Sequence, residues 1–201
     1  MKLYFSPQVC SLVPHIVLRQ LDVPFDLERV DFKTKLTSTG TPLASITPKN
    51  YVPVLQLDDG SLLTELAVII HHLADTHPHA KLAPPRRTMV RVHFDELVHF
   101  ISTELHKAFA PFTLLPNSSE ETKAFAKHRL GERAEVLRTQ LGTRDFIFGD
   151  TFTIADAYAF WALRAYSFLT KAPLEGTLKE YLARMTAWPS VKSAVDFEKR
   201  S

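Results

Sequence analysis

Apolar and polar residues follow two different spacings along the first eighty positions of the chain. Some segments are short and apolar or alternate with a period of two, as strands do, and others repeat apolar residues every three or four positions, as helices do. In the order strand, helix, strand, strand, strand and helix, these segments are residues 2–5, 11–21, 25–31, 54–57, 61–63 and 65–77. The pattern predicts a βαβ unit followed by a hairpin and a helix.

The composition changes at residues 77–87, HPHAKLAPPRR, where three prolines and several charges predict an extended connector. Beyond this connector the apolar spacing is helical throughout. The predicted helices span residues 88–109, 119–141, 153–167, 178–187 and 189–199. We therefore expect an α/β domain over residues 1–80, a linker over residues 81–87 and an all-helical bundle over residues 88–201.

Two short motifs sharpen this interpretation. Thr153 and Asp156 have the spacing of a capping box, which would close the start of the third predicted helix of the bundle. Pro53 opens a predicted strand directly after Val52, and an X-Pro bond in the cis form would turn the backbone of Val52 toward a peptide-like ligand. A trans proline at a sheet edge is the alternative, but the order of elements around Pro53 favours a thioredoxin-like domain with a mixed four-stranded sheet.

The composition excludes several classes of protein. The chain is 45% apolar and 23% charged, and its 24 Lys and Arg residues are interspersed with 22 Asp and Glu, so no surface for nucleic acid is predicted. No run is long enough to span a membrane, and the start, MKLYFSP, lacks the features of a secretory signal. We therefore expect a cytoplasmic protein, in which a single cysteine requires a second thiol-bearing molecule for any disulfide chemistry.

That cysteine, Cys10, stands at the start of the first predicted helix. Amides there and the positive end of the helix dipole favour a thiolate, which attacks electrophiles or disulfides. The alternative is a small buried apolar residue. Its neighbour Ser11 is either a second candidate for activating a thiol or a helix cap.

Polar residues also share a face of the predicted helix over residues 88–109. Glu96, His99, Thr103 and His106 are spaced by three, four and three positions, which suits either a solvated face or a site with an acid/base histidine. No histidine pair has the spacing of a helical zinc site, so no metal is expected.

Several longer stretches carry a resemblance to a known family. They are MKLYFSPQVCSLVPHIVLR, VDFKTKLTSTG, ITPKNYVPVLQLDDGSLLTE, STELHKAF and FTIADAYAFWAL. Through them the chain resembles the glutathione S-transferases, and their bacterial beta class in particular, along nearly its whole length. The resemblance implies a homodimer that holds glutathione, as a co-substrate, in the thioredoxin-like domain.

The resemblance also implies roles for individual residues. Cys10 matches the active-site cysteine of the beta class, whereas Ser11 lies near the serine that other classes use. Lys35 matches a cation for a glutathione carboxylate, and Glu65 an anion for the γ-glutamyl ammonium. Val52, held by Pro53, matches the residue whose backbone pairs with the cysteinyl unit.

On the predicted helix over residues 88–109, His106 and Lys107 match a pair that lies beside the sulfur across the cleft between the domains, and His99 and Thr103 extend that polar face. Two positions depart from the family pattern. Leu66 replaces a small residue that closes around the γ-glutamyl carboxylate, and His99 replaces an asparagine that reaches glutathione in the partner subunit. Both changes bear on how tightly glutathione binds.

The predicted function is conjugation of glutathione to small hydrophobic electrophiles, with thiol-disulfide exchange or peroxide reduction through Cys10 as further activities. Phe109, Phe112 and Phe168 are candidate walls of the electrophile pocket. The alternative, favoured by Leu66, is a non-catalytic transferase-like module that binds apolar ligands or a protein.

Overall fold

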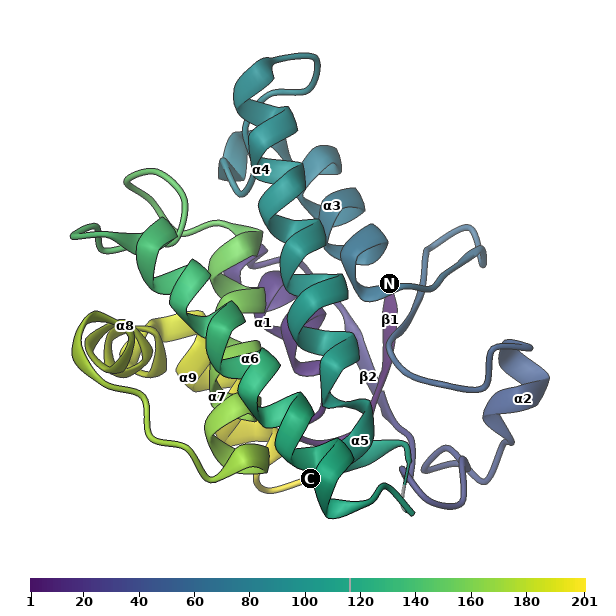
Figure 1. The fold of residues 1–201 in the computed structure, drawn as a ribbon. Helices are drawn as coiled ribbons and strands as arrows, with labels where there is room; N and C mark the ends of the chain where they lie inside the picture. The colour runs from purple at the N-terminus through teal and green to yellow at the C-terminus, as the bar shows by residue number, and fades with distance from the viewer. Residues whose placement is uncertain (116) are drawn as a thin grey trace. The chain divides into compact units, whose positions relative to one another are not determined.

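The computed structural model describes residues 1–115 and 117–201, which form two compact units (Figure 1). The first unit comprises residues 1–81 and 188–201, and the second comprises residues 82–187. The boundary near residue 81 lies where the linker was expected. The C-terminal segment differs from the expectation, because it joins the first unit rather than the helical bundle.

The first unit contains a four-stranded mixed sheet in the order β2-β1-β3-β4. The strands are β1 (Lys2–Phe5), β2 (Asp26–Arg29), β3 (Val54–Gln56) and β4 (Leu62–Leu63). β1 runs parallel to β2, with Leu3 opposite Leu27, and antiparallel to β3, with Leu3 opposite Leu55. β3 and β4 form the predicted hairpin. The thioredoxin-like α/β fold predicted for this part of the chain is confirmed.

Alternating residues of β1 serve opposite faces of this sheet. Tyr4 belongs to an apolar cluster with Val54 of β3 and with Val52, which lies just before that strand. The cluster also includes Leu43 of the short helix α2 (Leu43–Ile46). On the other face, the ring of Phe5 lies 6.1 Å from that of His15 in α1 (Leu12–Leu21). Val52 is therefore fixed by the core of the sheet.

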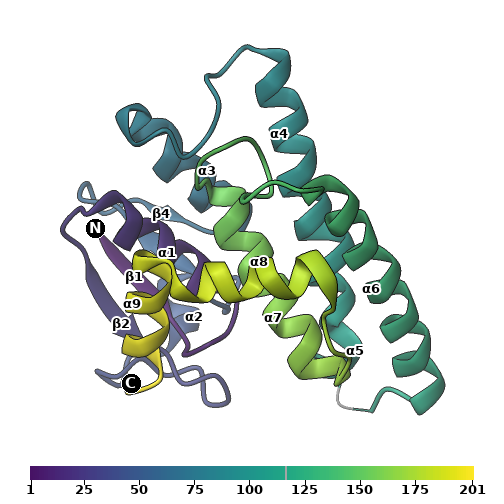
Figure 2. The same ribbon diagram turned by 90° about the vertical axis from the view of Figure 1, so that its left-hand side faces the viewer.

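Helix α1 contacts both α3 (Leu66–Thr76) and the C-terminal helix α9 (Pro189–Glu198). The contact with α9 explains why that segment joins this unit (Figure 2). Trp188 Nε1 donates to Gln20 Oε1 at 2.9 Å, and Ser190 Oγ donates to the same oxygen at 2.7 Å. A glutamine at the end of α1 thus anchors the start of α9. A single 3-10 turn, η1 (Pro78–Ala80), follows α3.

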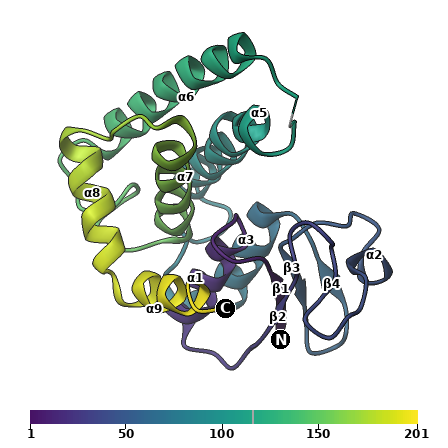
Figure 3. The same ribbon diagram turned by 90° about the horizontal axis from the view of Figure 1, so that it is seen from below.

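The second unit is all-helical, as predicted. Its elements are α4 (Met89–Phe100), η2 (Ile101–His106), η3 (Lys107–Phe109), α5 (Ala110–Thr113), α6 (Glu120–Leu141), α7 (Ile154–Thr170) and α8 (Gly176–Ala187). Helix α7 is largely buried and contacts α4, η2, α6 and α8. Figure 3 shows α7 beside α6 and α8. Among the described residues, no helix is both long and apolar enough to cross a membrane.

The start of α7 carries the predicted capping box. The Thr153 amide donates to Asp156 Oδ2 at 2.9 Å, and the Ile147 amide donates to Asp156 Oδ1 at 2.8 Å. Tyr181 of α8 adds a hydroxyl donor to Oδ1 at 3.0 Å. Asp156 therefore joins the loop, α7 and α8, in addition to capping the helix.

The helix expected over residues 88–109 is present, but it does not keep α-helical geometry along its whole length. Regular α-helical bonding ends at Phe100, and Ile101–His106 form a wider π-helical turn before a 3-10 turn at Lys107–Phe109. Pro111 disfavours α-helical bonding at Lys107, where the 3-10 turn begins, because proline lacks an amide donor and its ring would clash with the carbonyl of residue 107 in an α-helix. The wider turn also alters the spacing on which a common face for residues 96–106 was predicted.

Candidate functional site

The loop before α1 is held closed by a serine pair. Ser11 is fully buried, and its hydroxyl accepts from the Ser6 amide at 3.1 Å and donates to the Ser6 carbonyl at 3.0 Å. Ser11 occupies the N-cap position of α1, but its side chain makes no capping bond. Ser6 in turn donates its hydroxyl to the Val30 carbonyl at 2.7 Å. The hydroxyl of Ser11 therefore holds the loop that carries Cys10.

Cys10 lies at the end of this loop, directly before α1. Its side chain is half-buried, and Sγ lies 3.6 Å from the carbonyl oxygen of Val52, to which the thiol donates. The Val52–Pro53 peptide bond is cis. Of the residues that the sequence analysis selected, Cys10 and Val52 are thus brought into direct contact, although 42 positions separate them.

A buried polar network fixes the other side of the cysteine loop. Gln8 has a left-handed backbone with φ of 63°, and its amide donates to Glu198 Oε2 of α9 at 2.6 Å. Glu198 Oε1 lies 2.9 Å from His15 Nδ1, and both side chains are fully buried. Arg19 Nε donates to His15 Nε2, so Nδ1 carries the proton and donates to Glu198. The C-terminal helix therefore positions the backbone two residues before Cys10.

Glu65 sits at the start of α3 in an unusual conformation, with φ of 67° and ψ of 112°. Its Oε1 accepts from Lys49 Nζ and from the Tyr51 hydroxyl, each at 2.7 Å. The bond to Glu65 is the main cause that raises the pKa of Tyr51 to about 12, with burial adding to the effect. Because the Glu65 side chain is 45% exposed, its carboxylate remains accessible to a ligand from solvent.

Lys35 and Leu66 differ in exposure, since Lys35 lies on an exposed loop and Leu66 is buried. Lys35 has φ of 59°, and its Nζ lies 4.3 Å from the centroid of the Phe32 ring, which orients the amine on its loop. Leu66, the first residue of α3, is only 6% exposed. Its isobutyl group is therefore packed within the protein rather than projecting into solvent.

The candidates of the second unit lie at or after the end of α4. His106 Nδ1 is 2.7 Å from the Tyr158 hydroxyl, and the His106 ring lies edge-on to Trp161 with centroids 4.5 Å apart. These contacts fix the orientation of its imidazole. His99 Nδ1 bonds the Asp95 carbonyl and the Thr103 hydroxyl donates to the His99 carbonyl, so both side chains bond their own helix. Lys107 is exposed at the start of η3.

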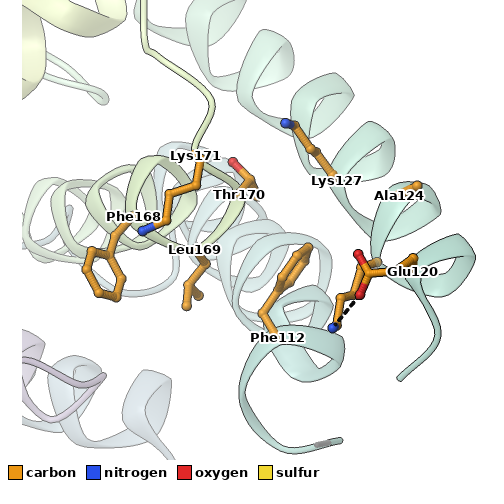
Figure 4. A pocket seen from close by; sticks show the side chains of 9 residues that line it. Phe112, Glu120, Ala124, Lys127, Phe168, Leu169, Thr170 and Lys171 are labelled. Atoms are coloured by element: carbon orange, nitrogen blue, oxygen red, sulfur yellow. Dashed lines mark hydrogen bonds and ion pairs between the residues drawn. The ribbon is translucent and has the colours of Figure 1, made fainter. Parts of the chain in front are cut away.

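A hollow of about 540 Å³ opens on the helical unit beside α5, α6 and the end of α7 (Figure 4). Two of the predicted pocket walls, Phe112 and Phe168, line it, whereas Phe109 is 3% exposed and does not. The remaining lining residues are Glu120, Lys123, Ala124, Lys127, Leu169, Thr170 and Lys171. Within residues 1–115 and 117–201, no group of three or more His, Cys, Asp or Glu side chains is arranged to hold a metal ion.

Sequence reasoning missed the partners of these residues. Lys49 and Tyr51 were not selected, although Tyr51 directly precedes Val52 in the stretch that carried the resemblance. His15 and Glu198 also escaped notice, because 183 positions separate them. The available signal was that each of these residues stands on the apolar side of its helix. A buried histidine or glutamate needs a polar partner, so each position indicated an unseen contact.

Known proteins match this chain over both units. Family models for the glutathione S-transferase N-terminal and C-terminal domains match residues 9–76 and 100–189. A glutathione S-transferase of Escherichia coli O157:H7 is 38% identical, over 98% of each chain.

Two solved structures have closely similar folds. A sphingomonad glutathione S-transferase in complex with glutathione has a TM-score of 0.92 at 32% identity, and covers 100% of both chains. A beta-class enzyme of Sphingomonas chungbukensis has a TM-score of 0.89 at 34% identity, over 98% of both chains. The similarity thus extends across the whole of the fold.

Proposed function

The chain belongs to the glutathione S-transferase family and is a glutathione transferase, and from this premise we propose that it conjugates glutathione to hydrophobic electrophiles. The glutathione thiolate attacks an electrophilic carbon, a carbon–sulfur bond forms, and the leaving group departs with its electron pair. The thiol proton passes to solvent. The N-terminal unit binds and ionises glutathione, and the helical unit provides apolar surface for the electrophile.

The contact between Cys10 and Val52 is the observation that carries this proposal. In the proposed complex the backbone of Val52 pairs with the cysteinyl unit of glutathione, as a strand pairs with an extended peptide. Because Cys10 Sγ lies 3.6 Å from the Val52 carbonyl, a cysteinyl unit on Val52 has its sulfur beside Cys10. Either sulfur then lies at the amino end of α1, where the helix dipole stabilises an anion.

The two ends of the tripeptide require opposite charges. Glu65 is proposed to meet the γ-glutamyl ammonium, and Lys35 a carboxylate. The burial of Leu66 supports this arrangement, since its side chain leaves the carboxylate of Glu65 accessible. His106 is proposed as a hydrogen-bond donor or acid/base toward the thiol.

Three further polar residues of the helical unit are proposed as contacts of glutathione. They are His99, Thr103 and Lys107. Ser11 is assigned a structural role here, because both hydrogen bonds of its hydroxyl are made to Ser6. Cys10 is therefore the proposed partner of the substrate sulfur.

Thiol-disulfide exchange is a second candidate activity, and the half-buried position of Cys10 favours it. The Cys10 thiolate attacks one sulfur of oxidised glutathione, the disulfide of that molecule breaks, and a glutathione thiolate leaves. A peroxide would instead oxidise Cys10 to the sulfenic acid and be reduced to an alcohol. Glutathione then condenses with the sulfenic acid to give the mixed disulfide and water.

We further propose a cytoplasmic homodimer. Three apolar residues of α4 are more than half exposed, namely Met89 at 66%, Val90 at 56% and Val92 at 53%. Covering these exposed side chains with a second copy would remove apolar surface from water. The reducing cytoplasm keeps a lone cysteine in the thiol form that both proposed activities require.

Calorimetric titration with glutathione, followed by a conjugation assay with 1-chloro-2,4-dinitrobenzene, tests the function. We expect saturable binding and turnover in the wild type. The single variant Cys10→Ala, which keeps Ser11, should lose most of the turnover. Absence of binding at millimolar glutathione would favour the non-catalytic module instead. For the exchange activity, mass spectrometry should detect one glutathionyl group on Cys10 after exposure to oxidised glutathione.

A further inference from the structure

A lysine and a tyrosine bond the same carboxylate oxygen of Glu65, directly before α3. Lys49 Nζ and the Tyr51 hydroxyl each donate to Glu65 Oε1 at 2.7 Å. These two donors flank Asn50, whose left-handed backbone, with φ of 53°, turns the chain between them. Glu65 therefore reaches a ligand as one member of a polar cluster of three side chains, all of which belong to the first unit.

The two donors differ in charge. Lys49 carries an ammonium, whereas Tyr51 is a neutral donor, because its bond to Glu65 and its burial raise the pKa of its hydroxyl to about 12. The side chains of Lys49 and Glu65 are 42% and 45% exposed, so solvent reaches both members of the ion pair. A ligand therefore meets one positive and one negative group that lie 2.7 Å apart. An ammonium alone would be attracted by the carboxylate and repelled by the lysine.

An α-amino acid carries the complementary pair of charges at nearly the same spacing. The standard N–Cα and Cα–C bond lengths and the angle between them place its ammonium nitrogen and its carboxyl carbon about 2.5 Å apart. An ammonium that lies beside Glu65 therefore brings the attached carboxylate within reach of Lys49 Nζ. The four charges then alternate in sign, and each group gains a charge-assisted hydrogen bond.

The start of α3 favours a carboxylate at the same place. Leu66 is the first residue of this helix, and the first amides of an α-helix have no partner within the helix and lie at the positive end of its dipole. The Leu66 side chain is 6% exposed and has no hydrogen-bonding group. A charged partner for the carboxylate has to come from another residue, and Lys49 is the cation that the structure places beside Glu65.

We propose that Lys49 is a specificity-determining residue, which binds the α-carboxylate of the γ-glutamyl unit while Glu65 binds the ammonium of that unit. The protein thereby selects thiols that end in a complete amino-acid zwitterion over thiols that end in an amine alone. Tyr51 is a positioning residue, because it holds the Glu65 carboxylate without adding charge. The inference rests on the proposed function, since it requires glutathione to bind with its γ-glutamyl end at Glu65.

Calorimetric titration with two thiols tests the role of Lys49. Glutathione carries both charges, whereas 4-aminobutanoyl-cysteinylglycine keeps the ammonium and lacks only the α-carboxylate. The measured quantity is the ratio of the Kd of this analogue to the Kd of glutathione. We expect a ratio of roughly ten in the wild type. In Lys49→Gln the ratio should fall roughly fivefold, because the amides at the helix start still favour the carboxylate.

Two further variants serve as controls. Lys49→Arg should keep most of the ratio, because a guanidinium also binds a carboxylate. Lys192→Gln removes the same charge from another exposed ion pair, which Lys192 forms with Asp196 of α9, and it should leave the ratio unchanged. An unchanged ratio in Lys49→Gln would overturn the proposal. This outcome includes the case in which both thiols bind more tightly because a competing amine has been removed.

A conjugation assay with 1-chloro-2,4-dinitrobenzene on the same samples separates failure of this inference from failure of the proposed function. A ratio that depends on Lys49, without turnover, would count against conjugation and support the role of Lys49. Binding and turnover with a ratio that does not depend on Lys49 would support the proposed function and overturn the role of Lys49. Absence of glutathione binding to the wild type would overturn both.

Discussion

Two carboxylates at the starts of helices show how differently this protein uses the same chemical group. Asp156, in the first turn of α7, is fully buried and accepts hydrogen bonds from the loop, its own helix and α8. Glu65, directly before α3, is 45% exposed and accepts from Lys49 and Tyr51. These two acidic residues therefore hold similar positions in their helices but lie in opposite environments.

The difference separates a structural group from a binding group. Every donor around Asp156 belongs to the protein, so its carboxylate holds elements together and no part of it faces a ligand. Glu65 has partners that solvent screens, and a ligand ammonium can join or replace them. A third carboxylate, Glu198, is a structural group that acts next to the candidate site. It is fully buried, and it accepts from the Gln8 amide two residues before Cys10.

The largest effect is expected for Glu198→Ala. It removes the acceptor of the buried His15 ring and of the Gln8 amide, so the free energy of unfolding should fall by about 3 to 5 kcal/mol. The cysteine loop should also loosen, and native Cys10 should be alkylated faster by iodoacetamide. Denaturant titration and alkylation rates measure both effects. Glu180→Ala, at an exposed site of α8, is the control, and equal stability of the two variants would contradict this role.

Asp156→Asn should have the next largest effect. An amide cannot accept from all the donors that face both carboxylate oxygens, so the free energy of unfolding at pH 7 should fall by about 2 to 4 kcal/mol. Thermal or urea unfolding measures this loss. A loss below about 0.5 kcal/mol would show that the buried cap is not a structural junction.

The difference in stability between the wild type and Asp156→Asn should also depend on pH. Burial raises the pKa of Asp156 to about 6, and the bonds from Ile147, Thr153 and Tyr181 oppose a larger rise. A raised pKa means that the folded state binds the proton more tightly, so this contribution to stability is present below about pH 3.8 and is lost as the pH rises through about 6. The stability advantage of the wild type over Asp156→Asn should therefore be roughly 3 kcal/mol larger at low pH than at pH 7. If the difference in free energy of unfolding between the two proteins were the same at both pH values, the raised pKa of Asp156 would be contradicted.

Glu65→Gln should act on binding rather than on folding. Loss of the charge should weaken glutathione binding about tenfold to a hundredfold, since hydrogen bonds between charged groups contribute more than neutral ones. The free energy of unfolding should change by less than about 1 kcal/mol, because the side chain is exposed. Calorimetry and denaturant titration on the same sample measure the two quantities. A large loss of stability with unchanged binding would reverse the comparison with Asp156.

The smallest effect is expected for Tyr51→Phe. Loss of one hydroxyl bond to Glu65 should raise the KM for glutathione about twofold to fivefold and leave kcat unchanged, because Lys49 still holds the carboxylate. Steady-state kinetics with varied glutathione measure both parameters. A fall in kcat at unchanged KM would place Tyr51 in the chemical step instead.

The periodicity of apolar residues was sufficient to predict the strands and most helices within a few positions, because those elements arise from local spacing. The helix α9 itself was predicted, but its placement in the helical bundle was wrong. The bonds from Trp188 and Ser190 to Gln20 join positions about 170 apart, and spacing along the chain carries no signal for them. The π-helical turn at Ile101–His106 was not predicted, because the spacing of apolar residues over 88–109 is also that of a regular α-helix.

The candidate site shows the same limit. Cys10, Val52 and Glu65 were selected through a resemblance, and the structure adds the partners that explain how each is held. The pairing of Tyr51 with Glu65 crosses a hairpin, and the bond of Ser11 to Ser6 closes a loop. Such polar contacts depend on how the chain turns back on itself, so no pattern of residue types predicts them.

A structure of the protein crystallised with reduced glutathione tests the central claim most directly. We predict that the cysteinyl unit pairs with the Val52 backbone, that its sulfur lies in van der Waals contact with Cys10 Sγ at about 4 Å, and that the ammonium meets Glu65. Glutathione bound with its sulfur remote from Cys10, or on another part of the chain, would contradict the account.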